Sequence, residues 1–454
     1  METKRKRRGR TFRIRCHRGK NSSNLSRGEI ITDAHWKDFV VWLKSNGFPK
    51  TKLTLGNFQG IGRGLLVTKK IKAGEVIISV PKKFLLTREM VIPELDNIFS
   101  KHGCSLKHND NISAYQAIAL YLALQKHQQK RKNSCDSFFL PYLKLLPEDF
   151  CSLPFFFDDN LFELLPKIVK DDVKRQRQKF EHDYDNVKCY LKLVNISRPE
   201  FIWGWFCVNT RCIYLKTNKP SRSLDNIAVA PMLDFLNHNY KAKIKGEYNN
   251  SSNCYEITTF TPYQKGEQAF INYGPHDNFF TLIEYGFVLS NNPYNYVSVD
   301  NEFSMLSIPN ETIASKAEKI NLLSSQGFLE DYTLRFSEIS FRLLAALRFR
   351  VIQNHQLSFA WDDTSFPSKE RQQQHRRYKQ TIMKEWKSLV NGQMEHVDPE
   401  NEQLVKVCLT WICDHVIKDA KDALMILEKC DLNDSSIWHI KQIWQETIGI
   451  VKSV

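Results

Sequence analysis

Apolar residues recur along this chain at two different spacings, which predict helices in some segments and strands in others. Residues 33–43, DAHWKDFVVWL, carry apolar side chains at helical spacing, and the helix breakers Gly47 and Pro49 follow. The next segment holds two short β-rich runs, Leu65–Thr68 and Val76–Val80, with a Lys- and Gly-containing turn between them. We interpret these two runs as a hairpin-like β unit.

Residues 111–205 have a helical pattern. One apolar stripe in this segment consists of Phe180, Tyr184, Val187, Leu191 and Val194. Ser197 and Glu200 have the spacing of a capping box, and Pro199 lies in the first turn that would follow. We expect the helix that starts there to run through residues 201–213.

β character returns at residues 254–260, CYEITTF, and a turn leads to a second strand in residues 268–274, QAFINYG. From about residue 310 onward the pattern is helical. Its two apolar stripes are Phe336, Ile339, Leu343 and Leu347, and Val405, Leu409, Ile412, Val416, Ala420, Ala423 and Leu427. The polar residues 361–377 between them indicate a loop or an exposed helix start. This order predicts an α+β fold, in which helices interrupt one β domain and a separate, all-helical domain follows.

Length and composition describe a globular protein. The chain has 454 residues, of which 42% are hydrophobic, enough for two or three domains and a sizeable core. We predict no membrane span, because no apolar run reaches about 18 residues. The charged N-terminus also lacks the apolar segment of a secretory signal peptide.

The net charge of +15 is concentrated at the N-terminus. Residues 1–30 carry eleven Lys and Arg against two acids, a balance of +9 that leaves +6 for the rest of the chain. We expect a disordered basic arm. Its KRKRR run suits a nuclear localisation signal, and thus an importin contact, or a nucleic-acid contact, while a plain solvated tail is the alternative.

Cysteine and histidine spacing argues against a metal site. The eleven cysteines are an odd number and contain no CxxC pair, which excludes a zinc ribbon and a disulfide framework. Asp234 and His238 are four residues apart but have no third ligand at a suitable spacing. Reduced thiols indicate the nucleus and cytoplasm, and we predict that no metal is bound.

Three motifs contain residue types that can carry chemistry. GIGRGL, residues 60–65, is glycine-rich, but its spacing and the strand after it do not fit a dinucleotide-binding unit. APMLDFLNHNY, residues 230–240, places polar side chains in an apolar segment, where each unpartnered polar group costs about 1–3 kcal/mol. FINYGPHDN, residues 270–278, is followed by a second Tyr-Gly pair at Tyr285. Taken singly, these motifs indicate a turn, a capped helix end and half-buried packing tyrosines.

In this order, however, the GxG, NH, INYG and YGF motifs resemble the SET domain of protein-lysine methyltransferases. The helical insertion and the helical C-terminal region resemble the Rubisco large-subunit methyltransferase-like branch of that family, over roughly residues 45–440. The resemblance implies a SET catalytic domain at 31–300 with its insertion at about 105–205. It also implies a helical substrate-binding domain at 310–450 and S-adenosylmethionine as the cofactor. The zinc clusters of many histone methyltransferases are absent, consistent with the missing CxxC.

The resemblance also assigns roles to single residues. The backbone at Ile61, Gly62, Arg63 and Gly64 would hold the methionine part of the cofactor, and Asn237 its amino-acid group. The main chain of His238 would contact the adenine, Phe287 would pack against it, and Arg211 would lie near the cofactor carboxylate. Tyr273 would be the catalytic tyrosine next to the cofactor. Tyr285 would line the lysine channel, with backbone carbonyls near Arg211 and Asp234 at its mouth.

The chemistry explains these residue types. Methyl transfer from a sulfonium to an uncharged amine is an in-line displacement, so orientation contributes much of the catalysis. A narrow apolar channel lowers the pKa of a lysine by disfavouring its ammonium form. A tyrosine hydroxyl can fix the amine lone pair and stabilise the sulfonium charge. The aromatic face of Tyr285 would favour a cationic methylated amine by about 0.5–2 kcal/mol.

The resemblance thus predicts a monomeric protein-lysine N-methyltransferase that modifies a histone tail or a non-histone protein. A catalytically silent scaffold that binds a histone or another protein is one alternative, although an intact Tyr273 argues against it. A protein-histidine methyltransferase is another, since a related member of this branch methylates histidine in actin. That member departs from the lysine pattern around the second tyrosine, whereas this chain keeps EYGF, which favours lysine.

Overall fold

The computed structural model describes residues 27–106, 112–132, 137–215, 226–309, 311–352, 373, 380, 383–430 and 435–454. The chain divides into two compact units, the first made of Met1–Asn292 and Asp431–Ile440 and the second of Pro293–Cys430 and Lys441–Val454. Each unit is described by itself below. Most of the basic arm and of the polar segment 361–377 lies outside the described residues.

Three sheets build the β part of the first unit. The largest has the order β1 (Glu29–Ile30), β2 (Leu53–Phe58), β3 (Gly62–Val67), β10 (Gln268–Ile271) and β7 (Asn237–His238). A second sheet joins β4 (Glu75–Pro81), β9 (Cys254–Thr259) and β8 (Ile244–Asn249), and a third pairs β5 (Cys212–Tyr214) with β6 (Ile227–Val229). All neighbours are antiparallel except β10 and β7.

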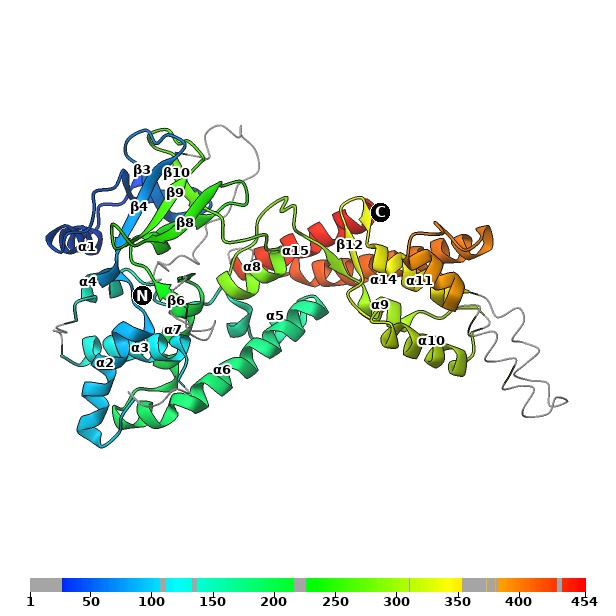
Figure 1. Cartoon of the computed structure of the whole chain (residues 1–454), viewed down its shortest axis with the longest axis horizontal. Coiled ribbons are helices and arrows are strands. Elements are labelled where there is room, and N and C mark those ends of the chain that lie inside the picture. Colours follow the sequence, from blue (N-terminus) through cyan, green and yellow to red (C-terminus); the bar gives the residue numbers. More distant parts are fainter. Residues whose placement is uncertain are drawn as a thin grey trace. The chain divides into compact units, whose positions relative to one another are not determined.

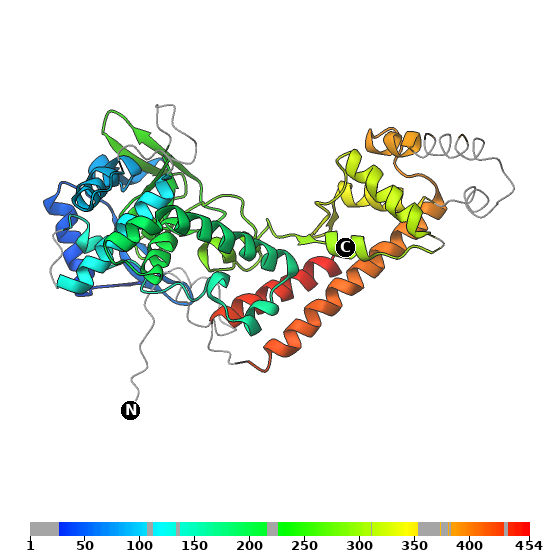
Figure 2. The same cartoon turned by 90° about the horizontal axis from the view of Figure 1, so that it is seen from below.

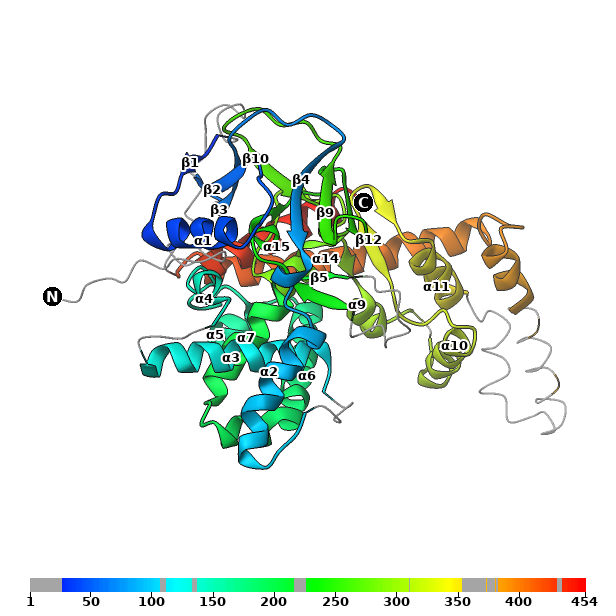
Figure 3. The same ribbon diagram turned by 60° about the vertical axis from the view of Figure 1, so that its left-hand side comes forward.

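Helices occupy the other side of this unit, as Figure 1 shows for α2, α3, α6 and α7. The helices are α1 (Ala34–Ser45), α2 (Arg88–Phe99), α3 (Ala114–Lys132), α4 (Leu140–Leu143), α5 (Asp159–Glu163), α6 (Lys167–Leu193), α7 (Arg198–Asn209) and α8 (Asn278–Tyr285). The last helix follows β10, and α2 to α7 lie between β4 and β5 in the sequence. Figure 3 shows α1 next to β1, β2 and β3.

Local sequence signals explain several of these helices. Asp33 caps α1 by accepting a hydrogen bond from the Trp36 amide at 2.7 Å. The predicted capping box of Ser197 and Glu200 is present at the start of α7. In α6 the predicted stripe faces the core, where Phe180, Val187 and Leu191 are almost completely buried. These signals act within a few residues, so the sequence alone identifies them.

Among its described residues, the second unit consists mainly of helices and contains one small sheet. Its helices are α9 (Asp300–Met305), α10 (Ile313–Ser325), α11 (Phe341–Val351), α14 (Pro399–Leu427) and the later part of α15 (Ser435–Lys452). Figure 2 shows α14 as one long orange helix, and its buried face contains Val405, Ile412, Val416, Ala420, Ala423 and Leu427 as predicted. The sheet has the order β11 (Val297–Ser298), β12 (Thr333–Arg335) and β13 (Glu338–Ile339).

Strand pairing corrects several expectations. The prediction that the runs around Leu65 and Val76 form a hairpin is wrong. β3 pairs with β2 and β10, whereas β4 pairs with β9. The helix expected through residues 201–213 ends at Asn209, and β5 follows it.

Two more corrections concern the ends of the predicted domains. Glu29–Ile30, at the end of the expected disordered arm, pairs with β2. The C-terminal region is not helical throughout, since Ile339 ends β13 and Phe336 is exposed between the strands. No described helix is both long enough and apolar enough to cross a membrane.

Candidate active site

The polar pair Asn237–His238 forms the short strand β7 and not a helix end. A 3-10 turn, Leu233–Phe235, precedes it, and β7 then pairs in parallel with β10, which places Asn237 opposite Phe270. The Asn237 side chain donates a hydrogen bond from Nδ2 to the carbonyl of Arg63 at 2.9 Å. The fold therefore brings the NH and GxG motifs together, although they are about 170 residues apart in the sequence.

Gly64 on β3 is the point of closest approach between these motifs. A Cβ atom at this position would lie 1.9 Å from Gln268 Nε2 and 2.8 Å from Asn237 Nδ2. At such distances a Cβ atom would force one or both of these amide side chains to shift. The glycine thus keeps the amides of Asn237 and Gln268 in place, because they occupy the space that a side chain would take.

Tyr273 lies next to this pair, two residues beyond the end of β10. Its backbone N–H donates to His238 Nδ1 at 3.0 Å, and its phenol donates to the Leu236 carbonyl at 2.7 Å. Burial, with the nearby His276 as a second cause, lowers the pKa of His238 to about 4. His238 is therefore neutral at physiological pH, and because Nδ1 accepts a hydrogen bond, its proton is assigned to Nε2.

Aromatic rings surround Tyr273. Its ring centroid lies 5.0 Å from that of Tyr285 and 5.1 Å from that of His238. Tyr285 is the last residue of α8, and Gly286 ends the helix in a left-handed conformation with φ of 72°. This turn brings Phe287 back beside Tyr285, with their rings nearly parallel and 6.0 Å apart. The tyrosine assigned to catalysis, Tyr273, and the one assigned to the lysine channel, Tyr285, thus lie side by side.

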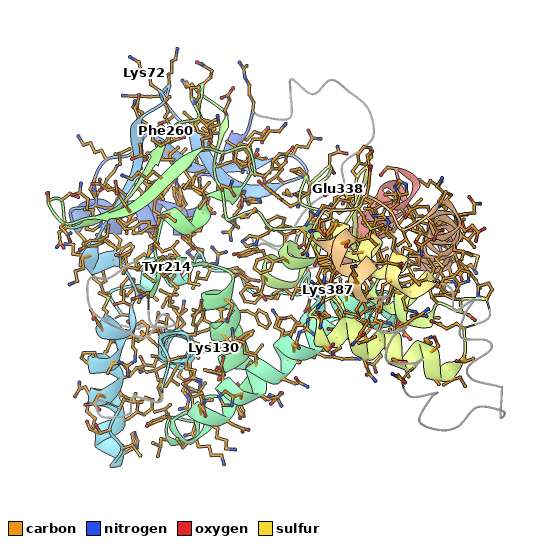
Figure 4. The ribbon with its side chains drawn as sticks, turned by 45° about the vertical axis from the view of Figure 1, so that its right-hand side comes forward. Lys72, Lys130, Tyr214, Phe260, Glu338 and Lys387 are labelled. Atoms are coloured by element: carbon orange, nitrogen blue, oxygen red, sulfur yellow. The ribbon has the colours of Figure 1, made fainter. Side chains whose placement is uncertain are left out.

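A buried ion pair joins two further predicted residues. Arg211 Nη1 donates to Asp234 Oδ2 at 2.7 Å, and both side chains are almost fully buried. The Tyr142 phenol donates to the same oxygen at 2.9 Å. Desolvation opposes the charge of Arg211, but Asp234 and Tyr142 together hold its pKa above the ordinary value. Strand β5 begins directly after Arg211 and ends at Tyr214, which is labelled in Figure 4. Tyr214 is 60% exposed.

Arg63 differs from its neighbours because its side chain turns away from Asn237. Its Nη2 donates to the carbonyl of Leu145 at 3.1 Å, while its own carbonyl accepts from Asn237. Burial and the neighbouring Arg211 lower its pKa to about 10, which leaves it cationic at neutral pH. Positive charge therefore lies near the cradle formed by β3 and Asn237.

These residues fit the amino-acid end of S-adenosylmethionine. Buried polar atoms without a hydrogen-bond partner in the described structure include His238 Nε2, Arg63 Nε, and both amide atoms of Gln268. Buried polar groups are normally satisfied, so these atoms indicate a site for a polar ligand. Within the described part of the chain, no three His, Cys, Asp or Glu side chains come together as a metal site.

Sequence reasoning missed the residues that hold this site together. Gln268 and Leu236 lack a motif of their own, and Tyr142 belongs to the helical insertion. Gln268 had one detectable signal, since it is a polar residue at the start of the otherwise apolar strand QAFI. A carbonyl such as that of Leu236 carries no signal at all in the sequence.

Comparison with known proteins agrees with this geometry. The family model of the SET domain matches residues 62–274, from the first residue of β3 to the residue after Tyr273. Two relatives with the same domain, 31% and 32% identical to this chain and each covered over 79% of its length, show together with this match that the chain belongs to the SET-domain family. The fold also agrees with the crystal structure of the SET domain of LSMT bound to lysine and AdoHcy. That match has a TM-score of 0.59 and 17% identity, and it covers 92% of this chain and 89% of that one.

Within the family, the chain is similar to SET domain-containing protein 4. The protein from Mus musculus is 31% identical over 366 residues, 77% of this chain and 79% of the relative. The protein from Homo sapiens is 32% identical over 361 residues, 76% of this chain and 79% of the relative. Ribosomal lysine N-methyltransferase set11 of Schizosaccharomyces pombe is 28% identical over 313 residues, 68% of this chain and 73% of that protein. These matches confirm the resemblance that the motifs indicated.

Proposed function

We propose that this chain is a protein-lysine N-methyltransferase that transfers a methyl group from S-adenosylmethionine to the side-chain amine of lysine. The observation that carries the proposal is the position of Tyr273. Its phenol is fixed on the Leu236 carbonyl, its ring lies 5.0 Å from that of Tyr285, and its backbone bonds to His238 beside Asn237. The named activity of a relative, the lysine methyltransferase set11, supports the same chemistry.

The cradle of β3 and β7 would bind and orient the cofactor. Asn237 and the backbone of Ile61, Gly62, Arg63 and Gly64 surround the position proposed for its amino-acid end. The polar side chain of Asn237 lies against β3 because Gly64 leaves room for it. Phe287 packs near His238, with ring centroids 6.3 Å apart, and would bind the flat adenine. When bound, the cofactor supplies an electrophilic methyl group on a positively charged sulfur.

Tyr273 and Tyr285 would orient the lysine amine. The Tyr273 phenol donates a hydrogen bond to the Leu236 carbonyl, so its oxygen lone pairs remain available to stabilise positive charge and to accept a hydrogen bond from an N–H. In the proposed transfer the uncharged amine held by these residues would take up the methyl group, and its excess proton would leave to water. Backbone carbonyls near Arg211 and Asp234 would line the channel mouth, held by the buried ion pair.

We propose that histone tails or other nuclear and cytoplasmic proteins are the substrates, and that the enzyme acts as a monomer. The basic composition of residues 1–30 supports nuclear import, or a nucleic-acid contact, by this arm. Deleting residues 1–26, which leaves β1 intact, should therefore abolish nuclear accumulation in cells, while a uniform distribution of both forms would contradict this role.

The function is tested by methyl transfer from labelled S-adenosylmethionine to histones and to a cell lysate, with methyl-lysine mapped by mass spectrometry. We expect transfer by the natural sequence and at least a hundredfold loss in Tyr273→Phe. Tyr248→Phe is the matched control, because Tyr248 lies on β8 and its phenol hydrogen-bonds to the exposed Asn253 side chain. Undiminished transfer by Tyr273→Phe would refute the catalytic assignment. Cofactor binding without transfer to any protein would favour the silent scaffold.

A further inference from the structure

We propose that His276 is a positioning residue for the catalytic Tyr273, an inference that rests on the proposed function. Strand β10 ends at Ile271, so the sheet does not hold the backbone of Tyr273. The ring of His276 donates from Nε2 to the Tyr273 carbonyl at 3.0 Å. Together with His238, which accepts from the Tyr273 N–H at 3.0 Å, it places an imidazole on each backbone polar group of the tyrosine.

The neighbouring backbone is held in the same manner. The Gly274 N–H donates to Asn272 Oδ1 at 2.9 Å, and Asn272 Nδ2 donates to the Tyr240 carbonyl at 3.2 Å. From Asn272 onward, side-chain hydrogen bonds thus take the place of the backbone hydrogen bonds between strands. A displaced backbone at Tyr273 would move its phenol away from the Leu236 carbonyl, because the rigid ring carries a shift of Cα to the hydroxyl.

His276 is itself rigidly placed. Its ring stacks on that of Phe280, with centroids 4.0 Å apart and an interplanar angle of 13°. Its carbonyl accepts from Asn292 Nδ2 at 2.9 Å. A Cβ on Gly274 would lie 2.5 Å from His276 Nε2, so the ring fills the space that the missing side chain leaves. These contacts fix the donor nitrogen of His276 relative to the Tyr273 carbonyl.

This arrangement also links Tyr273 to Tyr285. Phe280 lies in α8, whose last residue is Tyr285, and the rings of Phe280 and Tyr285 are 6.2 Å apart in an edge-to-face geometry. His276 therefore ties the backbone of Tyr273 to the helix that carries Tyr285. Its role is to set the distance between the two phenols that face the substrate amine.

The test compares His276→Ala with His276→Gln, because the glutamine Nε2 lies the same number of bonds from Cα and can donate. For methyl transfer we expect a ten- to hundredfold loss of kcat in His276→Ala, with the cofactor Kd within about twofold of the natural value. His276→Gln should regain most of that loss. His182→Ala, an exposed histidine on α6, is the matched control and should match the natural sequence.

The outcomes separate this inference from the proposed function. If His276→Ala has the same kcat as the natural sequence, the inference alone is overturned. It is also overturned if the alanine and glutamine variants lose kcat equally and both have a lowered Tm. Absence of transfer by the natural sequence overturns the function instead. In that case a crystal structure of His276→Ala decides the inference: we expect the Tyr273 phenol to leave the Leu236 carbonyl, and an unmoved phenol contradicts it.

Discussion

Replacing Gly64 by alanine tests whether close packing at β3 shapes the cofactor cradle. The new Cβ would lie 1.9 Å from Gln268 Nε2 and 2.8 Å from Asn237 Nδ2, distances that real contacts do not reach. One or both amides must therefore move. A shift of the Asn237 amide away from the new Cβ would lengthen or break its 2.9 Å hydrogen bond to the Arg63 carbonyl, which joins the two halves of the cradle.

The size of the effect follows from two contributions. Overpacking a well-packed site costs about 1–3 kcal/mol, so the free energy of unfolding should fall by an amount in this range. A displaced Asn237 would also lose a hydrogen bond to the charged cofactor, which is typically worth about 1.5–3 kcal/mol. Since about 1.4 kcal/mol corresponds to a factor of ten, the Kd for S-adenosylmethionine should rise roughly ten- to hundredfold.

Titration calorimetry with S-adenosylmethionine and urea unfolding measure these two effects. Gly449→Ala is the control, because nothing lies within 4 Å of its Cβ position, in the interior of α15. That variant should keep the natural Kd and gain up to about 1 kcal/mol of stability from helix propensity. A Gly64→Ala protein with natural affinity and natural stability would refute the packing argument.

Three further predictions concern the same region. Asn237→Ala should raise the Kd for S-adenosylmethionine at least tenfold in calorimetry while leaving the circular dichroism spectrum unchanged, and natural affinity would return the residue to a purely structural role. Asp234→Asn should lower the free energy of unfolding by about 3–5 kcal/mol, because it leaves the buried charge of Arg211 without its counter-ion. A double variant Arg211→Met/Asp234→Leu that is no more stable than Asp234→Asn would contradict this reason. Burial depresses the pKa of His238 from 6.5 to about 4, so between these values the unfolded chain binds a proton that the folded chain does not. The free energy of unfolding should therefore decrease as the pH is lowered, by on the order of 2 kcal/mol from pH 7 to pH 5. His238→Asn should remove that part of the pH dependence in urea unfolding.

Features with short-range signals were predictable from the sequence. The apolar stripe of α6, the capping box at Ser197 and the long buried face of α14 each depend on residues within one or two helical turns. The family resemblance was equally accessible, because four motifs in a fixed order do not require knowledge of their contacts.

Strand partners were not predictable in the same way. Alternation of apolar residues indicates a strand, but it does not identify the strand that pairs with it. The hairpin assigned to the runs near Leu65 and Val76 assumed that sequence neighbours pair, whereas β4 pairs with β9, nearly 180 residues away. β7 is only two residues long and shows no period at all, so its pairing with β10 follows from the fold and not from its composition.

The polar groups in residues 230–240 show why the site itself was only half predictable. Their burial implies partners, and the structure supplies these from distant segments: Arg211 and Tyr142 for Asp234, the Arg63 carbonyl for Asn237, and the Tyr273 N–H for His238. A backbone carbonyl or N–H can come from any residue. A sequence therefore shows that a buried polar group needs a hydrogen-bond partner but does not identify that partner. Because the same bonds satisfy the buried groups and aim the site, cofactor binding and folding stability must be coupled here. A variant of any one partner should therefore be measured for both.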